Sequence, residues 1–328
     1  MSMTNKEIYK KTIGFSIRRL LWDCFAVVIV AAIAIIGFGI AEATMNKGLI
    51  GLAIGVIVGL IVIAIMMRFI SYQYKAGQIA MMTKAVAEGK LPEDVIGEGK
   101  KVVKERFSTV AAYFAVTGVV KGIFNQIGRG ITAAGQAIGG DNGGAIGSAI
   151  SAVIQTIVSY LCDCCLGWVF YRKDEKATKA TCEGAVLFFK HGKTLAKNLG
   201  RVFGMGLASL LLIGGVFTGI FWLIFQACHE AFVGLGAEIA EAAARAGTEI
   251  SPVFTDPASL TIICAAIIGI IIWSFIHSTF IRPFVLIGVL RNYIESGMKD
   301  IPSEKSFDEL DKKSAKFKKL HEQLKAES

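Results

Sequence analysis

The sequence predicts an all-α, polytopic membrane protein with six transmembrane helices, built as three two-helix hairpins with amphipathic helices at the cytoplasmic interface. Three observations lead to this fold class. The 328 residues are 54% hydrophobic and 19% charged, and the mean hydropathy is +0.58, which is too apolar for one soluble domain. Apolar runs long enough to cross a bilayer recur along the chain. The loops between these runs alternate in charge, as expected for a multi-pass protein.

Apolar runs of two strengths define the expected spans. Four runs are clear, and each exceeds the roughly 20 residues that cross about 30 Å of hydrocarbon. They cover residues 20–41, 49–70, 203–227 and 259–281. Two weaker runs, 107–127 and 145–171, lie between the second and third of these. The first run is too long for the apolar part of a signal peptide and a second span follows it, so no cleaved signal is expected.

The charge of each loop indicates its side of the membrane. Lys and Arg are frequent before the first span and in the loops after the second and fourth, whereas the opposite loops carry one basic residue each: Lys47, Arg129 and Arg245. Because cytoplasmic loops collect basic residues, both termini are expected in the cytoplasm. The net charge of +9 then reflects loops that face anionic lipid, and no nucleic-acid partner is implied.

Two pairs of similar segments indicate an internal repeat. KTIGFSIRR (11–19) and KTLAKNLGR (193–201) each lead into a span, and IAMMTKAVAEG and IGVLRNYIESG close the following pair of spans at Gly89 and Gly297. Their helical periodicity and terminal glycines predict interfacial helices with glycine caps. Chance similarity among apolar segments is the alternative. The repeat divides the chain into four parts: a first two-span unit (1–97), a second with a glycine-rich outer loop (98–192), a third (193–298) and a charged C-terminal helix (299–328).

Small residues recur at every fourth position before and within the weaker run 145–171. Gly143, Gly147 and Ser151 would share one face of a helix, where a neighbouring helix can approach closely. Ordinary helix packing is the expected role, and a glycine-lined conduction path is the alternative. The preceding Asp141 and Asn142 predict a turn.

The sequence contains no motif that indicates catalysis or a bound cofactor. Phosphate-binding loops, HExxH and GxSxG are absent, so we do not expect an enzyme. Cysteines cluster in LCDCCLGWVF (161–170), where cytoplasmic thiols would serve packing or S-acylation rather than form disulfides. The sequence CHE (228–230) puts three potential ligands in consecutive positions that do not share a helix face, and no metal site is expected.

A few ionisable and aromatic residues inside the spans are candidates for contact with a substrate. Lys121 lies within the third predicted span, and His277 follows Trp273 by one helical turn in the sixth. Trp222 and Phe225 add aromatic faces that could hold a cation.

The second half of the chain carries further motifs in a recognisable order. A helix ends in LCDCCLGWVF, a basic connector reaches KNLGRV (197–202), a span contains LLLIGGVFTGIF, and the last span runs into FVLIGVLRNYIESG. This part, about residues 145–300, resembles the C-terminal part of the choline transporter-like family of solute carriers. The chain has fewer spans than that family and lacks its large N-terminal extracellular loop. The resemblance therefore implies fold and transport class, without transferable substrate residues.

Two functions remain open on this evidence. The first is a carrier or channel for a small cationic or zwitterionic solute, attracted by the acidic outer loop. The alternative is a non-transporting scaffold or assembly protein whose basic inner face recruits cytoplasmic partners or anionic lipid.

The C-terminal segment 303–328 predicts a helix with one apolar stripe. The stripe consists of Phe307, Leu310, Ser314, Phe317, His321 and Leu324. We expect this helix to dock on the inner face of its own chain or on a neighbouring subunit, as in a homo-oligomer. Its lysines would alternatively hold it to anionic lipid.

Overall fold

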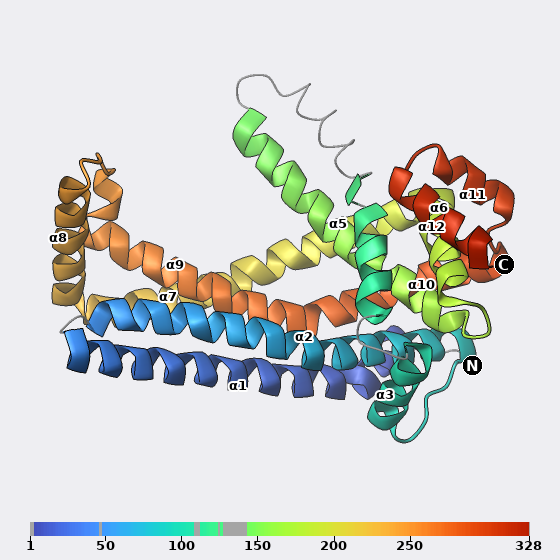
Figure 1. Cartoon of the computed structure of the whole chain (residues 1–328), viewed down its shortest axis with the longest axis horizontal. Helices are drawn as coiled ribbons and strands as arrows, with labels where there is room; N and C mark the ends of the chain where they lie inside the picture. The colour runs from blue at the N-terminus through green and yellow to red at the C-terminus, as the bar shows by residue number, and fades with distance from the viewer. Residues whose placement is uncertain (1–2, 46–47, 108–111, 124, 127–142, 328) are drawn as a thin grey trace. The chain divides into compact units, whose positions relative to one another are not determined.

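The computed structural model describes residues 3–45, 48–107, 112–123, 125–126 and 143–327, and this part of the chain is helical without strands (Figure 1). The all-α class is therefore confirmed. The α-helices are α1 (Asn5–Met45), α2 (Gly48–Glu88), α3 (Val95–Arg106), α5 (Gly143–Tyr171), α6 (Ala177–Ser209), α7 (Gly215–Gln226), α8 (His229–Arg245), α9 (Pro257–Ile276), α10 (Arg282–Lys299), α11 (Glu304–Asp311) and α12 (Ala315–Glu327). Shorter elements are a helix at Ala112–Ile123, the π-helical turns η2 (Leu210–Gly214) and η4 (His277–Ile281), and the 3₁₀ turn η3 (Pro252–Phe254).

Several of these helices are long and apolar enough to cross a membrane, which supports a membrane protein. Three segments qualify directly: Asn5–Thr44, Val202–Gln226 and Pro257–Lys299. A fourth qualifies if the two parts of α2, which bend by 41°, form one span. The count of six spans is not confirmed, because three helices of the described residues qualify, or four with α2.

The two outer closing segments of the repeat follow the preceding helices without an intervening loop. α2 runs through to Glu88, and α10 follows α9 directly through η4. The wide turn of η4 precedes Pro283, which lacks the N–H needed for a regular α-helical ladder. The predicted cap at Gly89 is confirmed by its φ of +70°. The predicted cap at Gly297 is wrong, because α10 continues past it.

The chain divides into two compact units, Met1–Leu199 with Pro283–Ser328, and Gly200–Arg282. In the first unit, α1 and α2 run antiparallel side by side (Figure 1). A capping box opens α1, since the Thr4 backbone N–H donates to Glu7 Oε2 at 2.7 Å and the Glu7 N–H donates to Thr4 Oγ1 at 3.3 Å.

Glycines of α2 form the closest part of the α1–α2 contact. A Cβ placed on Gly51 would lie 2.1 Å from the carbonyl oxygen of Gly37, and one on Gly55 would lie 2.7 Å from that of Ile33. Gly59, four residues further along, faces Val30 at 3.2 Å. Glycines at every fourth position let the backbones of α1 and α2 approach closely. In lipid, this close packing takes the place of the hydrophobic effect that joins helices in water.

The first unit combines an exposed apolar part with a buried core. Large hydrophobic side chains of α1 and α2 between residues 17 and 65 are mostly exposed, as expected for surfaces that face lipid. In contrast, residues 76–86, 158–170, 180–187 and 285–294 supply most of a close-packed core. Its largest fully buried side chain is Trp168. Gly297 is small because Trp168 fills its space, with a Cβ there only 2.4 Å from the indole ring.

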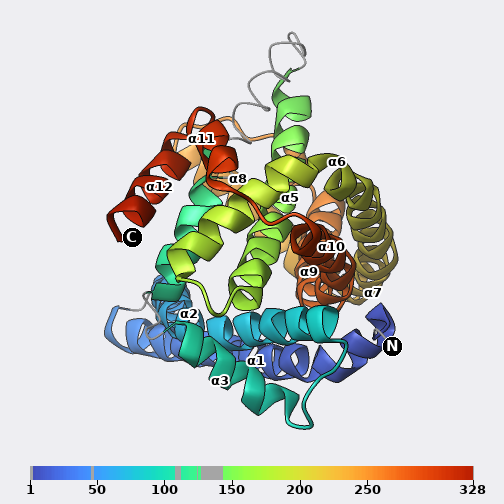
Figure 2. The same cartoon turned by 90° about the vertical axis from the view of Figure 1, so that its right-hand side faces the viewer.

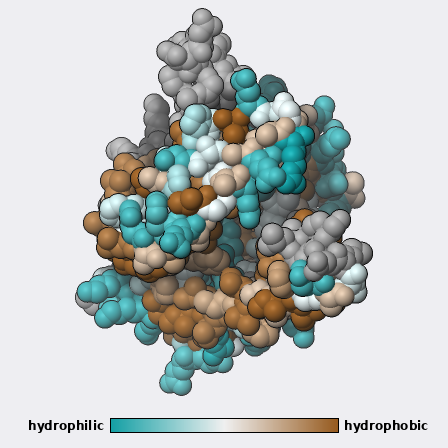
Figure 3. Space-filling model, turned by 90° about the vertical axis from the view of Figure 1, so that its left-hand side faces the viewer, coloured by the Kyte–Doolittle hydropathy of each residue, from teal (hydrophilic) through white to brown (hydrophobic). Residues whose placement is uncertain are grey.

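The second unit is a pair of apolar helices, η2–α7 and α9, joined through α8. A Cβ on Gly269 of α9 would lie 2.3 Å from Thr218 Oγ1 and 2.8 Å from the Gly214 carbonyl oxygen, so the two helices touch closely there. α9 begins with Pro257 after Asp256, whose carboxylate accepts the Ser259 N–H at 2.8 Å. The face of the molecule drawn in Figure 3 carries hydrophobic residues, in brown, beside hydrophilic ones, in teal.

The C-terminal segment forms two helices rather than one. α11 and α12 lie side by side (Figure 2) and are separated at Ser314. Both belong to one buried apolar cluster, which we call the tail cluster: Ile123, Cys182, Ala185, Val186, Phe307, Leu310, Phe317 and Leu320. The prediction that the tail docks on its own chain is confirmed by this cluster.

Candidate ligand pocket

A cavity of about 640 Å³ lies in the first unit between α2, the helix Ala112–Ile123 and α5. Polar and apolar side chains share its walls, which suits an amphipathic ligand. The lining residues are Lys75, Tyr113, Phe114, Thr117, Gly118, Lys121, Gln155, Val158, Ser159, Cys162, Asp163 and Leu166. We call this cavity the α2–α5 pocket.

An ion pair holds two of its walls together. Lys75 Nζ of α2 lies 2.6 Å from Asp163 Oδ1 of α5, and only 4% of the Asp163 side chain is exposed. Breaking such a pair from the lysine side would leave a buried carboxylate without its counter-charge, which is strongly unfavourable. The pair therefore fixes the polar end of the pocket.

Lys121 gives the pocket a net positive charge. Its side chain is exposed and makes no hydrogen bond or ion pair with the described residues. Tyr113 also lines the pocket, two helical turns before Lys121, and its ring packs against Tyr72 at 5.1 Å and Phe107 at 5.5 Å between centroids. Two lysines and one aspartate thus stand next to an aromatic wall, an arrangement that favours a ligand with an anionic group and an apolar part.

A second polar network lies where α5 ends and α6 begins. Glu183 is 1% exposed, and its carboxylate accepts the Trp168 indole N–H at 3.0 Å and Arg172 Nε–H at 2.9 Å. Arg106 of α3 donates to the carbonyl oxygens of Arg172 and Glu175, at 3.2 and 2.7 Å. These bonds satisfy carbonyl groups in the connection between α5 and α6, so the network is structural.

The pKa values of two side chains in this region are shifted by hydrogen bonding and by burial. The hydrogen bond from Lys179 lowers the pKa of Glu175. Burial raises the pKa of the Cys182 thiol to about 12, and the nearby carboxylates of Asp311 and Glu183 act in the same direction. Cys182 lies in the tail cluster, so it is an unreactive thiol as long as the tail stays docked.

The aromatic residues predicted to hold a substrate make different contacts in the structure. Trp273 donates its indole N–H to Ser209 Oγ at 2.9 Å and stacks on His277, with ring centroids 5.2 Å apart. Phe225 instead packs on Phe232 of α8 at 5.2 Å. Trp273 lies beside Gly214 of η2. Trp222 lies eight residues after Gly214, about 12 Å further along η2 and α7 at 1.5 Å per residue. The predicted Lys121 belongs to the first unit, in the α2–α5 pocket.

The small residues predicted for packing lie on α5. Gly143, Gly147 and Ser151 are helical, but their packing lies outside the described side chains. Sequence reasoning missed the contact glycines Gly51 and Gly55. Their spacing of four, with Gly59, was the signal that could have identified them. It also missed the pocket residues Lys75 and Asp163, which only the folded chain brings together.

Comparison with known proteins finds no matching family model, no similar curated protein and no similar solved structure. The expected likeness to choline transporter-like proteins thus receives no support from these comparisons and remains a prediction.

Proposed function

We propose that this chain is a membrane-anchored assembly protein, whose cytoplasmic helical domain binds the anionic headgroup of a phospholipid in the α2–α5 pocket. The observation that carries the proposal is the pocket itself. It combines Lys75 and Lys121 with an aromatic wall, and Lys75 follows the apolar run 49–70 by five residues. At that position the lysine would lie at the depth of lipid headgroups.

The topology that goes with this function has four spans. The tail cluster includes Ile123, and Ser314 Oγ donates to Gln126 Oε1 at 3.0 Å. A span over 107–127 would carry Gln126 to the outer surface, away from a cytoplasmic tail. We therefore propose that the segment between α2 and the end of the basic connector stays in the cytoplasm. This assignment keeps every strongly basic loop inside and the acidic segment 229–256 outside.

Labelling of introduced cysteines tests this topology. In a background with Cys228→Ser, which removes an exposed native thiol, we expect Ala43→Cys and Gly247→Cys to react with an impermeant maleimide on intact cells. Gln126→Cys should react only after permeabilisation, because it would lie on the cytoplasmic side. Reaction of Gln126→Cys in intact cells would contradict the four-span topology and support six spans.

Charge reversal at Lys121 tests the pocket. Lys121→Glu should weaken binding of a short-chain phosphatidylglycerol by about thirtyfold. Each basic group near an anionic lipid contributes about 1 kcal/mol, and charge reversal both removes this attraction and adds a repulsion of similar size. Thermophoresis of the detergent-solubilised protein measures the dissociation constant. Lys101→Glu is the matched control, since Lys101 is an exposed lysine of α3 outside the pocket. Equal weakening by both variants would mean diffuse surface attraction and would contradict the pocket.

A carrier remains the second candidate, and one observation favours it. The Trp273–Ser209 hydrogen bond joins the residue directly before the π-helical turn η2 to a residue one helical turn before η4, and such turns are frequent at functional sites. Flux of an organic cation into liposomes that falls with Trp273→Ala would support the carrier over the assembly protein.

A further inference from the structure

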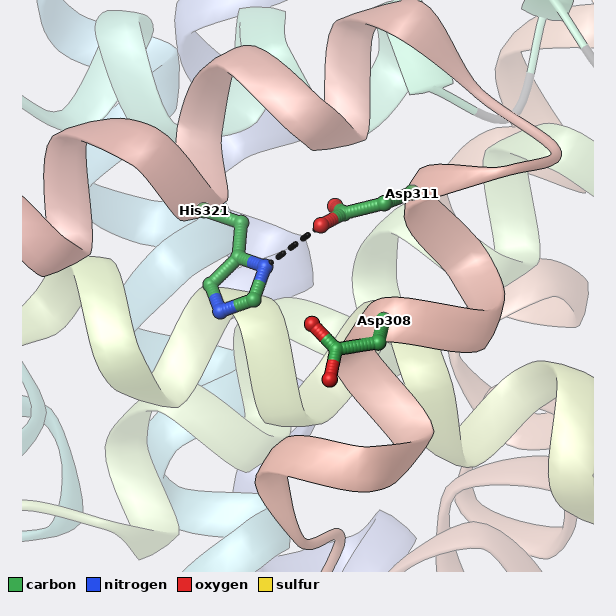
Figure 4. Close-up of side chains that lie close together, drawn as sticks. All are labelled: Asp308, Asp311 and His321. Atoms are coloured by element: carbon green, nitrogen blue, oxygen red, sulfur yellow. Dashed lines mark hydrogen bonds and ion pairs between the residues drawn. The ribbon is translucent and has the colours of Figure 1, made fainter.

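Three potential metal ligands meet between the two tail helices (Figure 4). Asp308 and Asp311 lie one turn apart on α11, and His321 reaches toward them from α12. One ligand atom from each residue lies within 4.8 Å of the other two. Sequence spacing did not indicate this group, because the histidine comes ten residues after Asp311 and only the turn at Ser314 brings it back.

The packing around His321 holds the imidazole in place. Its side chain is 3% exposed, and its ring meets Phe307 and Phe317 at centroid distances of 5.3 and 6.2 Å. Nδ1 lies 2.8 Å from Asp311 Oδ2. A ligand fixed by its surroundings loses little freedom on binding, so this orientation favours an ion.

Asp311 supplies an independent sign that a partner is missing. Its Oδ1 atom is buried and has no hydrogen-bond partner among the described residues. A buried carboxylate oxygen without a donor is unfavourable, and an ion is one of the standard explanations for it. Asp308 completes the set from the solvent side, where its long contact of 3.9 Å with Lys325 is weak enough to be replaced.

We propose that Asp308, Asp311 and His321 bind a divalent transition-metal ion of the Zn²⁺ type, which links α11 to α12. One imidazole and two carboxylates suit Zn²⁺, whereas Ca²⁺ and Mg²⁺ prefer oxygen ligands alone. Bonds of about 2.0–2.2 Å require Nδ1 and Oδ2 to move apart by about 0.5 Å. The ion replaces the hydrogen between them, and the imidazole proton moves to Nε2. Water fills the fourth position on the exposed side.

The ion would act on tail docking. Phe307 and Phe317 come from the two linked helices and both belong to the tail cluster. An ion that binds only the docked arrangement stabilises it by mass action. Cys182 reports on this, because the docked tail covers its thiol.

Titration calorimetry of ZnCl₂ into the full chain in detergent tests the proposal. We expect one saturable ion per chain at this site. Asp308→Asn should weaken it at least tenfold, and Asp308 is exposed, so the variant should fold even if His321→Ala does not. The matched control Glu309→Gln, an exposed acid on the same helix, should leave binding unchanged. Zn²⁺ should also slow the reaction of Cys182 with maleimide in the wild type more than in Asp308→Asn.

The same experiment can overturn the site. Absence of saturable Zn²⁺ binding, binding of Ca²⁺ without Zn²⁺, or equal affinity in Asp308→Asn would each do so. Equal losses in Asp308→Asn and Glu309→Gln would indicate only a diffuse acidic surface.

Discussion

Replacing Gly51 by leucine should dismantle the α1–α2 hairpin and prevent recovery of folded protein. The position has no room for a side chain, because a Cβ there would lie 2.1 Å from the Gly37 carbonyl oxygen and 2.4 Å from the Ala41 Cβ. Neither neighbour can rotate away, since one is backbone and the other is the first atom of its side chain. The helices would have to separate, at a cost of at least about 3 kcal/mol.

Gly39→Leu provides the matched control for this prediction. Gly39 lies on α1 only two residues from Gly37, yet nothing is within 4 Å of a Cβ placed on it. The two variants therefore add the same side chain to the same hairpin, in one case between the helices and in the other outside them. Size-exclusion profiles and thermal unfolding in detergent compare them. A Gly51→Leu protein as stable as Gly39→Leu would mean that α1 and α2 do not pack as described.

Glu183→Ala should lower the free energy of unfolding by about 3 kcal/mol. Breaking a buried ion pair costs about 3–5 kcal/mol, and the lower value applies because 22% of the Arg172 side chain is exposed. The substitution leaves the Arg172 guanidinium and the Trp168 indole N–H without their buried acceptor. Since Trp168 is the largest fully buried side chain of the core, the substitution should also weaken the packing of the core around it, beyond the connection between α5 and α6.

The neighbouring acid Glu175 separates burial from charge in this experiment. Glu175 also contacts Arg172, at 3.0 Å, but its side chain is 31% exposed. Glu175→Ala should therefore cost no more than about 1 kcal/mol, as for an exposed pair. Denaturant unfolding followed by tryptophan fluorescence measures both variants. Similar losses for Glu175→Ala and Glu183→Ala would refute the special role of the buried carboxylate.

The sequence predicted helices well because apolar length and periodicity are local properties. The runs at 20–41 and 259–281 fall within helices that qualify as spans, and the run at 203–227 matches a third, Val202–Gln226, to within one residue. The weaker run at 107–127 stays a prediction as a span, because an apolar helix of a buried core and a membrane-spanning helix look alike in composition. The closing segments follow the preceding helices without a loop, and Pro283, which could break the second of them, is accommodated after η4. Their predicted place at the membrane interface stays a prediction.

Site residues were harder to predict because the pairs that matter are distant in sequence. Lys75 and Asp163 are 88 residues apart and gain meaning only as an ion pair at 2.6 Å. His321 was assigned to the apolar stripe of the tail, and the structure buries it there. The contact of His321 with Asp311 depends on the break at Ser314, because a single continuous helix would keep the two side chains apart.

The first unit is assembled from segments near both ends of the chain, so its core cannot be completed until the last of them is synthesised. α10 contributes Leu290 and Tyr293 to a core whose other members, on α2, α5 and α6, precede it by about a hundred residues or more. Arg291 also bonds Asn5, at 2.8 Å between Nε and Oδ1. The ribosome therefore synthesises α2, α5 and α6 long before α10, the segment that completes their core. Until residues 283–299 are synthesised, the apolar faces of α5 and α6 lack the α10 side chains that complete their core.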